Sequence, residues 1–310
     1  MANEPTFPGS TYAGAAAGKY ISAALLSAPT IENGGVTVLE NVKGSSVLQT
    51  IDTNDLFQDA TCDFDVTRTV TMGEQILTVK DMQVNLQLCR SQFHDTWSAI
   101  EMGASAFADI PKSFEDYLLG YVAAKVAASN ETLLWRGVAG ANAYDGLVTL
   151  GVAQIVAGQQ IAAIVSTALN VIDEMGKVID LIPTTVYGTE SLKLYISSNI
   201  ARNYVRALGG FAAAGLGANG TDNKGTQWYT NGKLSFDGIP VFVASGLGDN
   251  TMMAAQSDNL YFGTSLLSDW QNSASVVPVH LYDGSDNVRI VMRMTAGAQI
   301  GIADDCVLYS

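Results

Sequence analysis

The chain has 310 residues and a net charge of −14, with 48% hydrophobic but only 15% charged residues. This length suffices for one large or two ordinary domains with a sizeable core. The acidic balance argues against tight nucleic-acid binding, which needs Lys and Arg, although it does not prevent a protein from enclosing DNA. Charged residues usually make up about 25% of a protein. The surface must therefore be largely uncharged, as in a protein covered by neighbours or in a globular protein rich in Ser, Thr and Gly.

The cysteines and the start of the chain bear on its compartment. Cys62, Cys89 and Cys306 are odd in number and widely spaced, so we expect neither a disulfide framework nor a zinc site, and a reducing compartment fits. Residues 1–10 contain no basic region followed by an apolar core, so no secretion signal is expected. Residues 146–172 lack charge, but their Gln, Asn and Gly residues oppose membrane insertion. We interpret them as a buried strand followed by a helix, and expect no membrane partner.

The N-terminal third is predicted to consist of extended segments. Residues 1–45 contain little that could form a core alone, so they are either an arm ordered on a partner surface or a disordered tail. Residues 61–88 alternate apolar and polar side chains on both sides of Gly73, which predicts a long two-stranded ribbon. An isolated ribbon is marginally stable in water. We therefore expect the ribbon to pack against something else, such as another subunit.

A long helix is predicted over residues 113–136. Ser113 and Asp116 have the spacing of a capping box, apolar residues recur at helical spacing after them, and Gly137 is placed to end the helix. This helix is long enough to be the spine of a domain.

The remaining elements alternate between helices and strands. We expect helices over 167–182 and from Ser198 to Leu208, separated by a strand at 192–196, and then a glycine-rich loop over 209–225. Next come a buried strand at 239–245, two short strands, a hairpin turning at Asp283-Gly284, and a final strand over 298–310. The predicted fold is a single interwoven α+β body with an arm and a projecting ribbon.

The side chains that most often carry chemistry show no catalytic or metal-binding spacing. The two histidines, His94 and His280, lack neighbouring ligands at metal spacing, and no serine stands in a nucleophile elbow. Asp283, Asp286 and Asn287 lack the EF-hand pattern and its distal glutamate. We interpret the histidines as structural residues and the acidic group as a solvated turn.

One glycine motif suggests a cofactor site. Gly215, Gly217 and Gly220 spell G-x-G-x-x-G, but a dinucleotide site needs a strand before this motif and a helix after it. Here a helix precedes it and a polar segment follows, so a loop is the better interpretation. No cofactor is predicted, and the chain is not expected to be an enzyme.

The order of the local patterns resembles the HK97-like fold of tailed-phage major capsid proteins. The segments that carry the resemblance are NETLLWRG (130–137) with YDGL (144–147), LKLYISSNIARNYVRAL (192–208), FDGIPVFVASGL (236–247), NLYFGTSLLSDW (259–270) and VRIVMRMTAGAQIGIADDCVLY (288–309). Tyr144 stands where the family often has proline near Asp145. The chain also begins at its arm, so any scaffold is expected to be a separate protein or to have been removed.

The resemblance implies named parts. Residues 1–47 would be the N-arm, 48–92 the E-loop region, 93–157 with 271–310 the P-domain, and 158–270 the A-domain. The E-loop would turn near Met72-Gly73-Glu74, and the loop with Gly215, Gly217 and Gly220 would lie near the capsomer centre. The expected inter-subunit contact residues are Arg68, Met72, Gly73, Glu74, Gln75 and Lys80. Some relatives cross-link subunits through an E-loop lysine, but nothing near Lys80 suggests an activating carboxylate.

The resemblance also implies a function. The chain would assemble into the hexamers and pentamers of an icosahedral phage head that encloses double-stranded DNA without reading its sequence. Its partners would be copies of itself, a scaffolding protein, a portal and a decoration protein, with assembly in the host bacterial cytoplasm. The alternatives are a phage tail-tube or decoration protein, or a β-rich hydrolase, which would need a cleft with a perturbed carboxylate or histidine. Gly73→Pro or deletion of 70–76 is expected to leave a soluble subunit and impair particles.

Overall fold

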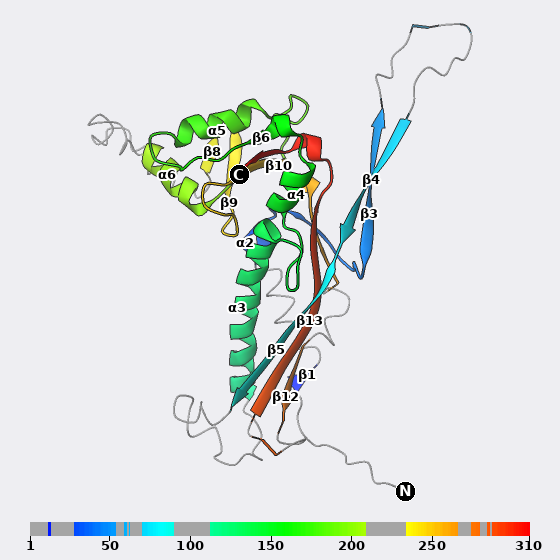
Figure 1. The fold of residues 1–310 in the computed structure, drawn as a ribbon, viewed down its shortest axis with the longest axis vertical. Coiled ribbons are helices and arrows are strands. Elements are labelled where there is room, and N and C mark those ends of the chain that lie inside the picture. Colours follow the sequence, from blue (N-terminus) through cyan, green and yellow to red (C-terminus); the bar gives the residue numbers. More distant parts are fainter. Residues whose placement is uncertain are drawn as a thin grey trace.

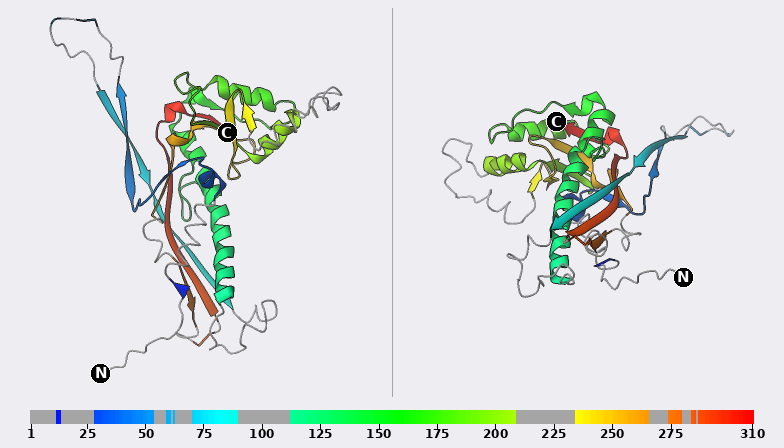
Figure 2. Two further views of the ribbon diagram at one scale, coloured as in Figure 1. Left: turned by 180° about the vertical axis from the view of Figure 1, so that it is seen from behind. Right: turned by 60° about the horizontal axis from the view of Figure 1, so that its bottom comes forward.

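The computed structural model describes residues 12–13, 28–53, 59–60, 62, 70–89, 112–208, 234–265, 274–279, 284–285 and 287–310. Within these ranges, a long helix stands beside a long sheet, a smaller α/β body lies at one end of both, and a two-stranded hairpin projects away from them (Figures 1 and 2). This arrangement confirms the α+β prediction.

The first sheet is built around one long strand. β13 (Asn287–Ile300) pairs along one side with β5 (Lys80–Cys89) and along the other with β12 (Ala274–Pro278) and then β11 (Leu260–Thr264), all antiparallel. β1 (Tyr12–Ala13) extends the sheet beyond β12, and β2 (Thr37–Leu39) pairs in parallel with β11. The hairpin of β12 and β13 was predicted from the sequence and is confirmed.

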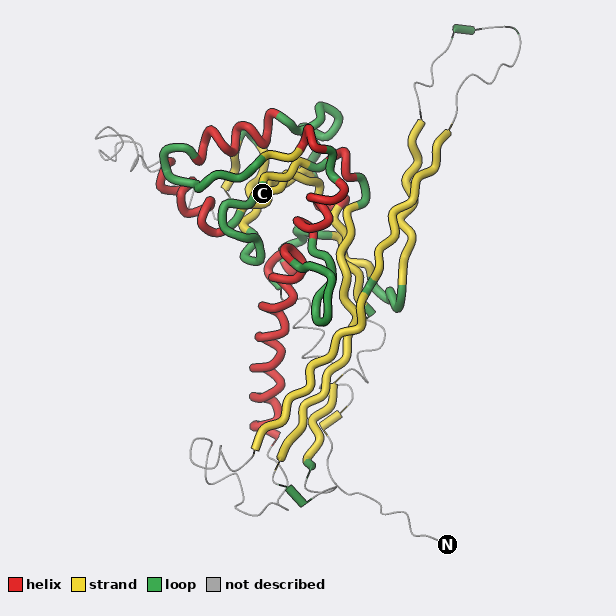
Figure 3. Tube along the Cα trace, viewed as in Figure 1, coloured by secondary structure: helices red, strands yellow, loops and turns green. Residues whose placement is uncertain are grey.

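Helix α3 (Lys112–Arg136) packs against this sheet and confirms the predicted long helix (Figure 3). Its apolar side chains share one core with strands β11 to β13, and Trp135 is fully buried near its end. Gly137 follows the last residue of the helix, as predicted, and a larger residue does not fit there because a Cβ would collide with the backbone carbonyl of Tyr144. Trp135 also packs against Tyr195 of the second body, with ring centroids 5.2 Å apart. The spine helix thus joins the two bodies.

The second sheet lies in the smaller body. Its strand order is β6 (Gln160–Ile161), β14 (Val307–Tyr309), β10 (Met252–Gln256), β7 (Leu192–Ile196), β9 (Ile239–Val243) and β8 (Leu234–Phe236). Helices α5 (Val171–Asp180) and α6 (Ser198–Leu208) share its hydrophobic core. The predicted strand at 192–196 and the predicted helix at 198–208 are confirmed. The buried strand predicted at 239–245 is present as a strand over Ile239–Val243, but most of it is not buried, and Val243 is 42% exposed. Single-turn 3-10 helices lie at Ala157–Gln159, Ser257–Asn259 and Ala303–Asp305.

Residues 146–172 differ from the predicted strand and helix. They form helix α4 (Leu147–Gln154), the two-residue strand β6 and then a loop. A short apolar run does not distinguish a buried strand from a buried helix, since both lack a polar face. In the part of the chain that the structure describes, no helix has the length and apolarity needed to cross a membrane.

The predicted helix at 167–182 begins later, at Val171. The Asn170 side chain accepts hydrogen bonds from the backbone N–H of Thr167 at 2.7 Å and from its hydroxyl at 3.0 Å, which fixes residues 167–170 as a turn. Leu169 therefore lies in this turn, outside the helix, and is 77% exposed.

The C-terminal segment 298–310 is not one strand. Its first residues end β13, a corner follows, and β14 joins the second sheet. Asn259 fixes this corner: its amide donates to the Ile302 carbonyl at 2.7 Å, and its oxygen accepts from the Ile302 N–H at 2.6 Å. The expected boundaries at 270 and 271 therefore do not follow the sheets, because β11 lies in the first sheet and β14 in the second.

Candidate functional site

The projecting hairpin consists of β3 (Ser45–Thr53) and β4 (Val70–Thr78), which pair antiparallel over nine residues each. The prediction of a ribbon over 61–88 that turns at Met72-Gly73-Glu74 is wrong. Gly73 lies in the middle of β4 opposite Thr50, and the connection from β3 to β4 falls within 54–69, mostly outside the described residues. The period-2 pattern identified β4 and β5 as strands, but it contains no information about which strand each one pairs with.

The two faces of this hairpin have opposite surroundings. On one face, Leu77 is fully buried and the side-chain amide of Gln299 donates to Gln75 at 3.1 Å, so this face rests on the body near its base. The opposite face points into solvent. Its apolar side chains, 50–68% exposed, are Val47, Ile51, Val70, Met72 and Ile76. We call these five residues the apolar hairpin face.

The register arranges the apolar hairpin face as cross-strand pairs. Val47 lies opposite Ile76, and Ile51 lies opposite Met72. Glu74 stands between these two pairs. Fully burying one such side chain contributes about 1.5–3 kcal/mol. Completing the burial of five half-exposed ones would therefore contribute on the order of 5 kcal/mol. An exposed apolar strand face of this kind marks an interaction surface.

A second apolar surface lies between α3 and β5, in a groove of about 420 Å³. Lys125 is the single charged residue in its lining, and the Lys125 ammonium lies 5.8 Å from the centre of the Tyr121 ring. The apolar lining residues are Met82, Val84, Leu86, Tyr121, Val122, Val126, Leu133 and Met294. We call this the α3–β5 groove.

The predicted contact residues fall in different environments. Met72 and Glu74 lie on the exposed side of the hairpin, whereas Gln75 faces the body. Lys80 begins β5, and its ammonium donates to the carbonyls of Gly140 and Ala143, so it ties down a loop of its own chain. Outside the described residues lie Arg68, Gly215, Gly217, Gly220, His94 and His280. The roles expected of them stay predictions.

Sequence reasoning missed β3 and the groove. Val47 and Ile51 are four positions apart in a nine-residue strand, and this even spacing is a period-2 signal at 45–53. The groove has no comparable signal, because its lining comes from β5, α3 and β13, which are far apart in sequence.

Part of the expected arm is fixed to its own chain. Helix α2 (Pro29–Glu32) lies at the end of α3, where the buried Glu131 carboxylate accepts from the Thr30 N–H at 3.1 Å and from the Thr30 hydroxyl. The indole N–H of Trp135 donates to the same hydroxyl at 2.9 Å. The expectation that residues 1–45 need a partner surface is therefore wrong for α2 and β2, which pack within the chain.

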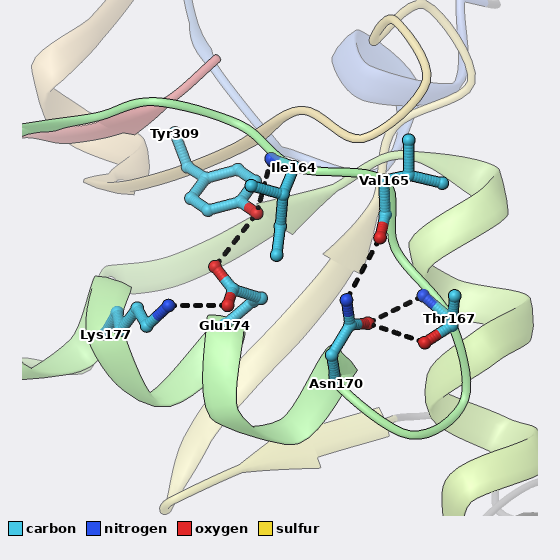
Figure 4. Close-up of polar contacts among 7 residues, drawn as sticks. All are labelled: Ile164, Val165, Thr167, Asn170, Glu174, Lys177 and Tyr309. Carbon is cyan, nitrogen blue, oxygen red and sulfur yellow. Dashed lines mark hydrogen bonds and ion pairs between the residues drawn. The ribbon is translucent and has the colours of Figure 1, made fainter.

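Polar contacts in the second body fix a loop that displays further apolar side chains (Figure 4). The Tyr309 hydroxyl donates to Glu174 at 3.0 Å and accepts from the Ile164 N–H at 3.0 Å, while Lys177 pairs with the other oxygen of Glu174 at 2.6 Å. The Asn170 amide donates to the Val165 carbonyl at 3.0 Å. The loop is thus held in a defined shape, although its side chains are exposed.

Three groups with a raised pKa belong to the core. Burial raises the pKa of Tyr144 and Tyr195 well above the usual tyrosine value, and burial together with Asp305 raises the pKa of Cys306 to about 12. Tyr144 donates to Asn130 at 2.9 Å, and Tyr195 donates to the Gly35 carbonyl. These groups are buried hydrogen-bond partners. Among the described residues, no cluster of His, Cys, Asp and Glu could hold a metal ion.

The combination of spine helix, long sheet, smaller α/β body and projecting hairpin is the HK97-like fold of phage capsid proteins. The chain is similar to a capsid protein of an empty GTA particle, with 13% identity, a TM-score of 0.58, and coverage of 99% of this chain and 94% of that one. It is similar to the capsid of Myoviridae phage XM1, with 13% identity, a TM-score of 0.55, and coverage of 100% and 95%.

A third similar structure is a procapsid of satellite phage P4 that includes the size determination protein Sid, with 8% identity and a TM-score of 0.58. It covers 100% of this chain and 92% of that one. No protein-family model and no curated protein matches the sequence. The likeness is therefore one of fold, and it confirms the fold that the resemblance implied.

Proposed function

We propose that this chain is a major capsid protein that assembles into the hexamers and pentamers of an icosahedral tailed-phage head enclosing double-stranded DNA. The observation that carries the proposal is the hairpin that projects from the body (Figure 1), because the side chains of its apolar hairpin face are 50–68% exposed. The fold supports it, because capsid structures match this chain over almost their whole length.

The energetics of the hairpin suit a shell. A shell built from both hexamers and pentamers needs many moderate contacts, and one hairpin face supplies about 5 kcal/mol by the burial argument above. Contacts of this size stay reversible during assembly, while their number makes the closed shell resist opening. The acidic net charge of −14 suits a wall that encloses DNA without holding it tightly.

The parts of the chain receive their roles within this proposal. The β3–β4 hairpin would be the E-loop, α3 and the first sheet the P-domain, the second sheet with its helices the A-domain, and 209–225 a loop at the capsomer centre. The partners would be copies of this chain, a separate scaffolding protein, a portal and a decoration protein. Assembly would take place in the host bacterial cytoplasm, and the protein would end in the virion.

Electron microscopy of the purified protein tests the proposal. We expect closed shells or capsomers, whereas stacked rings would indicate a tail-tube protein and discrete small particles would contradict assembly. The double variant Ile51→Ser with Met72→Ser should stay soluble, unfold at the same urea concentration as the parent and form at least 10-fold fewer shells. Gln49→Ser, opposite Glu74 on the same face of the hairpin, is the control and should assemble normally.

The pairing of β3 with β4 changes the interpretation of the Gly73→Pro variant and of the 70–76 deletion. Because Gly73 lies within β4, proline there removes a backbone donor from the hairpin, and deletion of 70–76 removes most of a strand. Both changes are expected to disrupt the hairpin itself. The serine variants are the sharper test because they leave the backbone pairing intact.

A further inference from the structure

We propose that the chain fixes the direction of its own hairpin with a two-point mount, a glycine notch on one face of the first sheet and a lysine tie on the other. The notch is formed by Gly263 and Gly297, and the tie is the contact of Lys80 with the carbonyls of Gly140 and Ala143. The mount acts within one chain, so this inference does not depend on the proposed function.

The notch is a pair of glycines that face each other across two strands. Gly263 of β11 lies opposite Gly297 of β13, so the sheet has no side chain at this point. A Cβ on Gly297 would collide with the backbone carbonyl of Thr78 and lie 3.0 Å from the Val79 Cα. A Cβ on Gly263 would lie 2.7 Å from a methyl group of Leu77. The root of the hairpin therefore fits against the sheet because both positions are glycine.

The tie lies on the opposite face of the sheet. Lys80 pairs with Ala296, and paired residues share a face. Consecutive residues of a strand point to opposite faces, so the Lys80 side chain points away from the notch at Gly297. It reaches the loop that follows α3, where its ammonium donates to the Gly140 carbonyl and, at 3.2 Å, to the Ala143 carbonyl. The hairpin root is thus held from both faces of the sheet, which prevents rotation about either contact alone.

The other strand of the hairpin is fixed at the same place. The Val79 N–H donates to the Gly44 carbonyl at 3.0 Å, directly before β3 begins. Just upstream, the Val42 N–H donates to the Thr264 carbonyl at 3.2 Å, and the Val42 carbonyl accepts from the Thr295 hydroxyl at 3.2 Å. Both strands therefore leave the body from one root, and the hairpin can change its direction only by moving as a unit about that root.

The surroundings of the tie leave room for such movement once the tie is broken. Lys80 lines two cavities, one of about 400 Å³ that also borders Val79 and Tyr144, and one of about 920 Å³ that also borders Asn142 and Arg293. Since these spaces are open, the ammonium contact, rather than core packing, limits movement of the root toward the loop.

Spin-label distances in the unassembled subunit measure the direction of the hairpin. One label is placed at Gln49→Cys, exposed on β3, and the other at Thr132→Cys, exposed on α3, in a chain in which serine replaces Cys62 and Cys89. Cys306 is buried and stays unlabelled. Pulsed electron paramagnetic resonance should give a single narrow distribution of distances for this chain, because the mount holds the hairpin in one direction.

Removal of the tie should widen this distribution. We expect Lys80→Met to widen it at least twofold at an unchanged urea midpoint, whereas Lys80→Arg, which can donate to the same carbonyls, keeps it narrow. The matched control is Lys177→Met, which removes an exposed lysine paired with Glu174 on the second body and should change nothing. A distribution that is already broad with Lys80 present, or one that Lys80→Met leaves unchanged, would overturn the proposal.

Variants of the notch test the second point. Gly297→Ala should shift the mean distance by about 2 Å, because the root must move to relieve a collision and the label lies about 16 Å further along the hairpin. Gly263→Ala meets only the flexible end of Leu77 and should shift it less. If Gly297→Ala does not fold, Val79→Ala, which empties part of the notch, should widen the distribution. An unchanged distribution in the folded variant contradicts the notch. Both tests use the free subunit, so their failure leaves the capsid function standing.

Discussion

The contact between α2 and the spine helix allows a quantitative prediction. Thr30→Val keeps the shape of the side chain and the methyl group that packs against Gly35, but it removes the hydroxyl that donates to Glu131 and accepts from Trp135. A hydrogen bond to a charged group is worth about 1.5–3 kcal/mol, and an orphaned buried donor costs about 1–3 kcal/mol. We expect the free energy of unfolding to fall by about 3–5 kcal/mol.

Urea unfolding of the unassembled subunit, followed by tryptophan fluorescence, measures this loss, and Trp135 lies at the altered site. The matched control is Thr30→Ser, which keeps the hydroxyl and loses one methyl group, at a cost of about 0.5–1.5 kcal/mol. A loss below about 1 kcal/mol for Thr30→Val, or equal losses for the two variants, would show that the Glu131 carboxylate does not hold α2 through this hydroxyl.

Four further predictions concern buried positions. Gly137→Ala should cost about 2 kcal/mol or more in urea unfolding because its Cβ meets a backbone carbonyl, whereas Gly158→Ala, with open space around it, should change stability by less than about 0.5 kcal/mol. Because burial raises the pKa of Cys306 from 9.0 to about 12, iodoacetamide at pH 8 should modify the exposed Cys62 and spare Cys306, as mass spectrometry would show. The unfolded chain ionises this thiol first, so the stabilising contribution of Cys306 should be complete below pH 9 and fall as the pH rises toward 12. Tyr309→Phe should cost about 1–3 kcal/mol, since it leaves the Ile164 N–H unpaired; an unchanged urea midpoint would contradict this.

The sequence predicted the helices and strands whose formation depends on the spacing of residues close together in the chain. The spine helix was found because apolar residues recur at helical spacing and Gly137 follows it, and the structure places its end at Arg136. The strand at 192–196 and the helix from Ser198 were found for similar reasons. In contrast, the start of α5 depends on a side-chain turn at Asn170, and the corner after β13 depends on Asn259, some 40 residues away in sequence. Single side-chain hydrogen bonds such as those of Asn170 and Asn259 leave no periodic pattern in the sequence.

The register of the hairpin was the largest error, and its cause is physical. Alternation in 61–88 correctly indicated strands with one covered face, and β4 pairing with β3 rather than with β5 changes only which backbone groups meet. Gly73 looked like a turn because glycine is permissive, yet it lies within a strand where a Cβ would approach the Thr50 hydroxyl to 2.6 Å. Glycine there reflects close contact between strands rather than a change of chain direction.

The same alternation contains more information when it is compared with burial in the lone chain. Val70, Met72 and Ile76 show the pattern of residues that face a core, but the structure leaves each of them at least half exposed. A sequence pattern reflects every surface that the folded protein covers, including surfaces covered by other chains, whereas the coordinates of one chain show only what that chain covers itself. Positions where the pattern indicates burial and the lone chain shows exposure are therefore the positions at which assembly is expected. In this protein, such positions lie together on one face of the β3–β4 hairpin, which projects from the body. Their position on this hairpin, more than the number of apolar residues, makes it an assembly element.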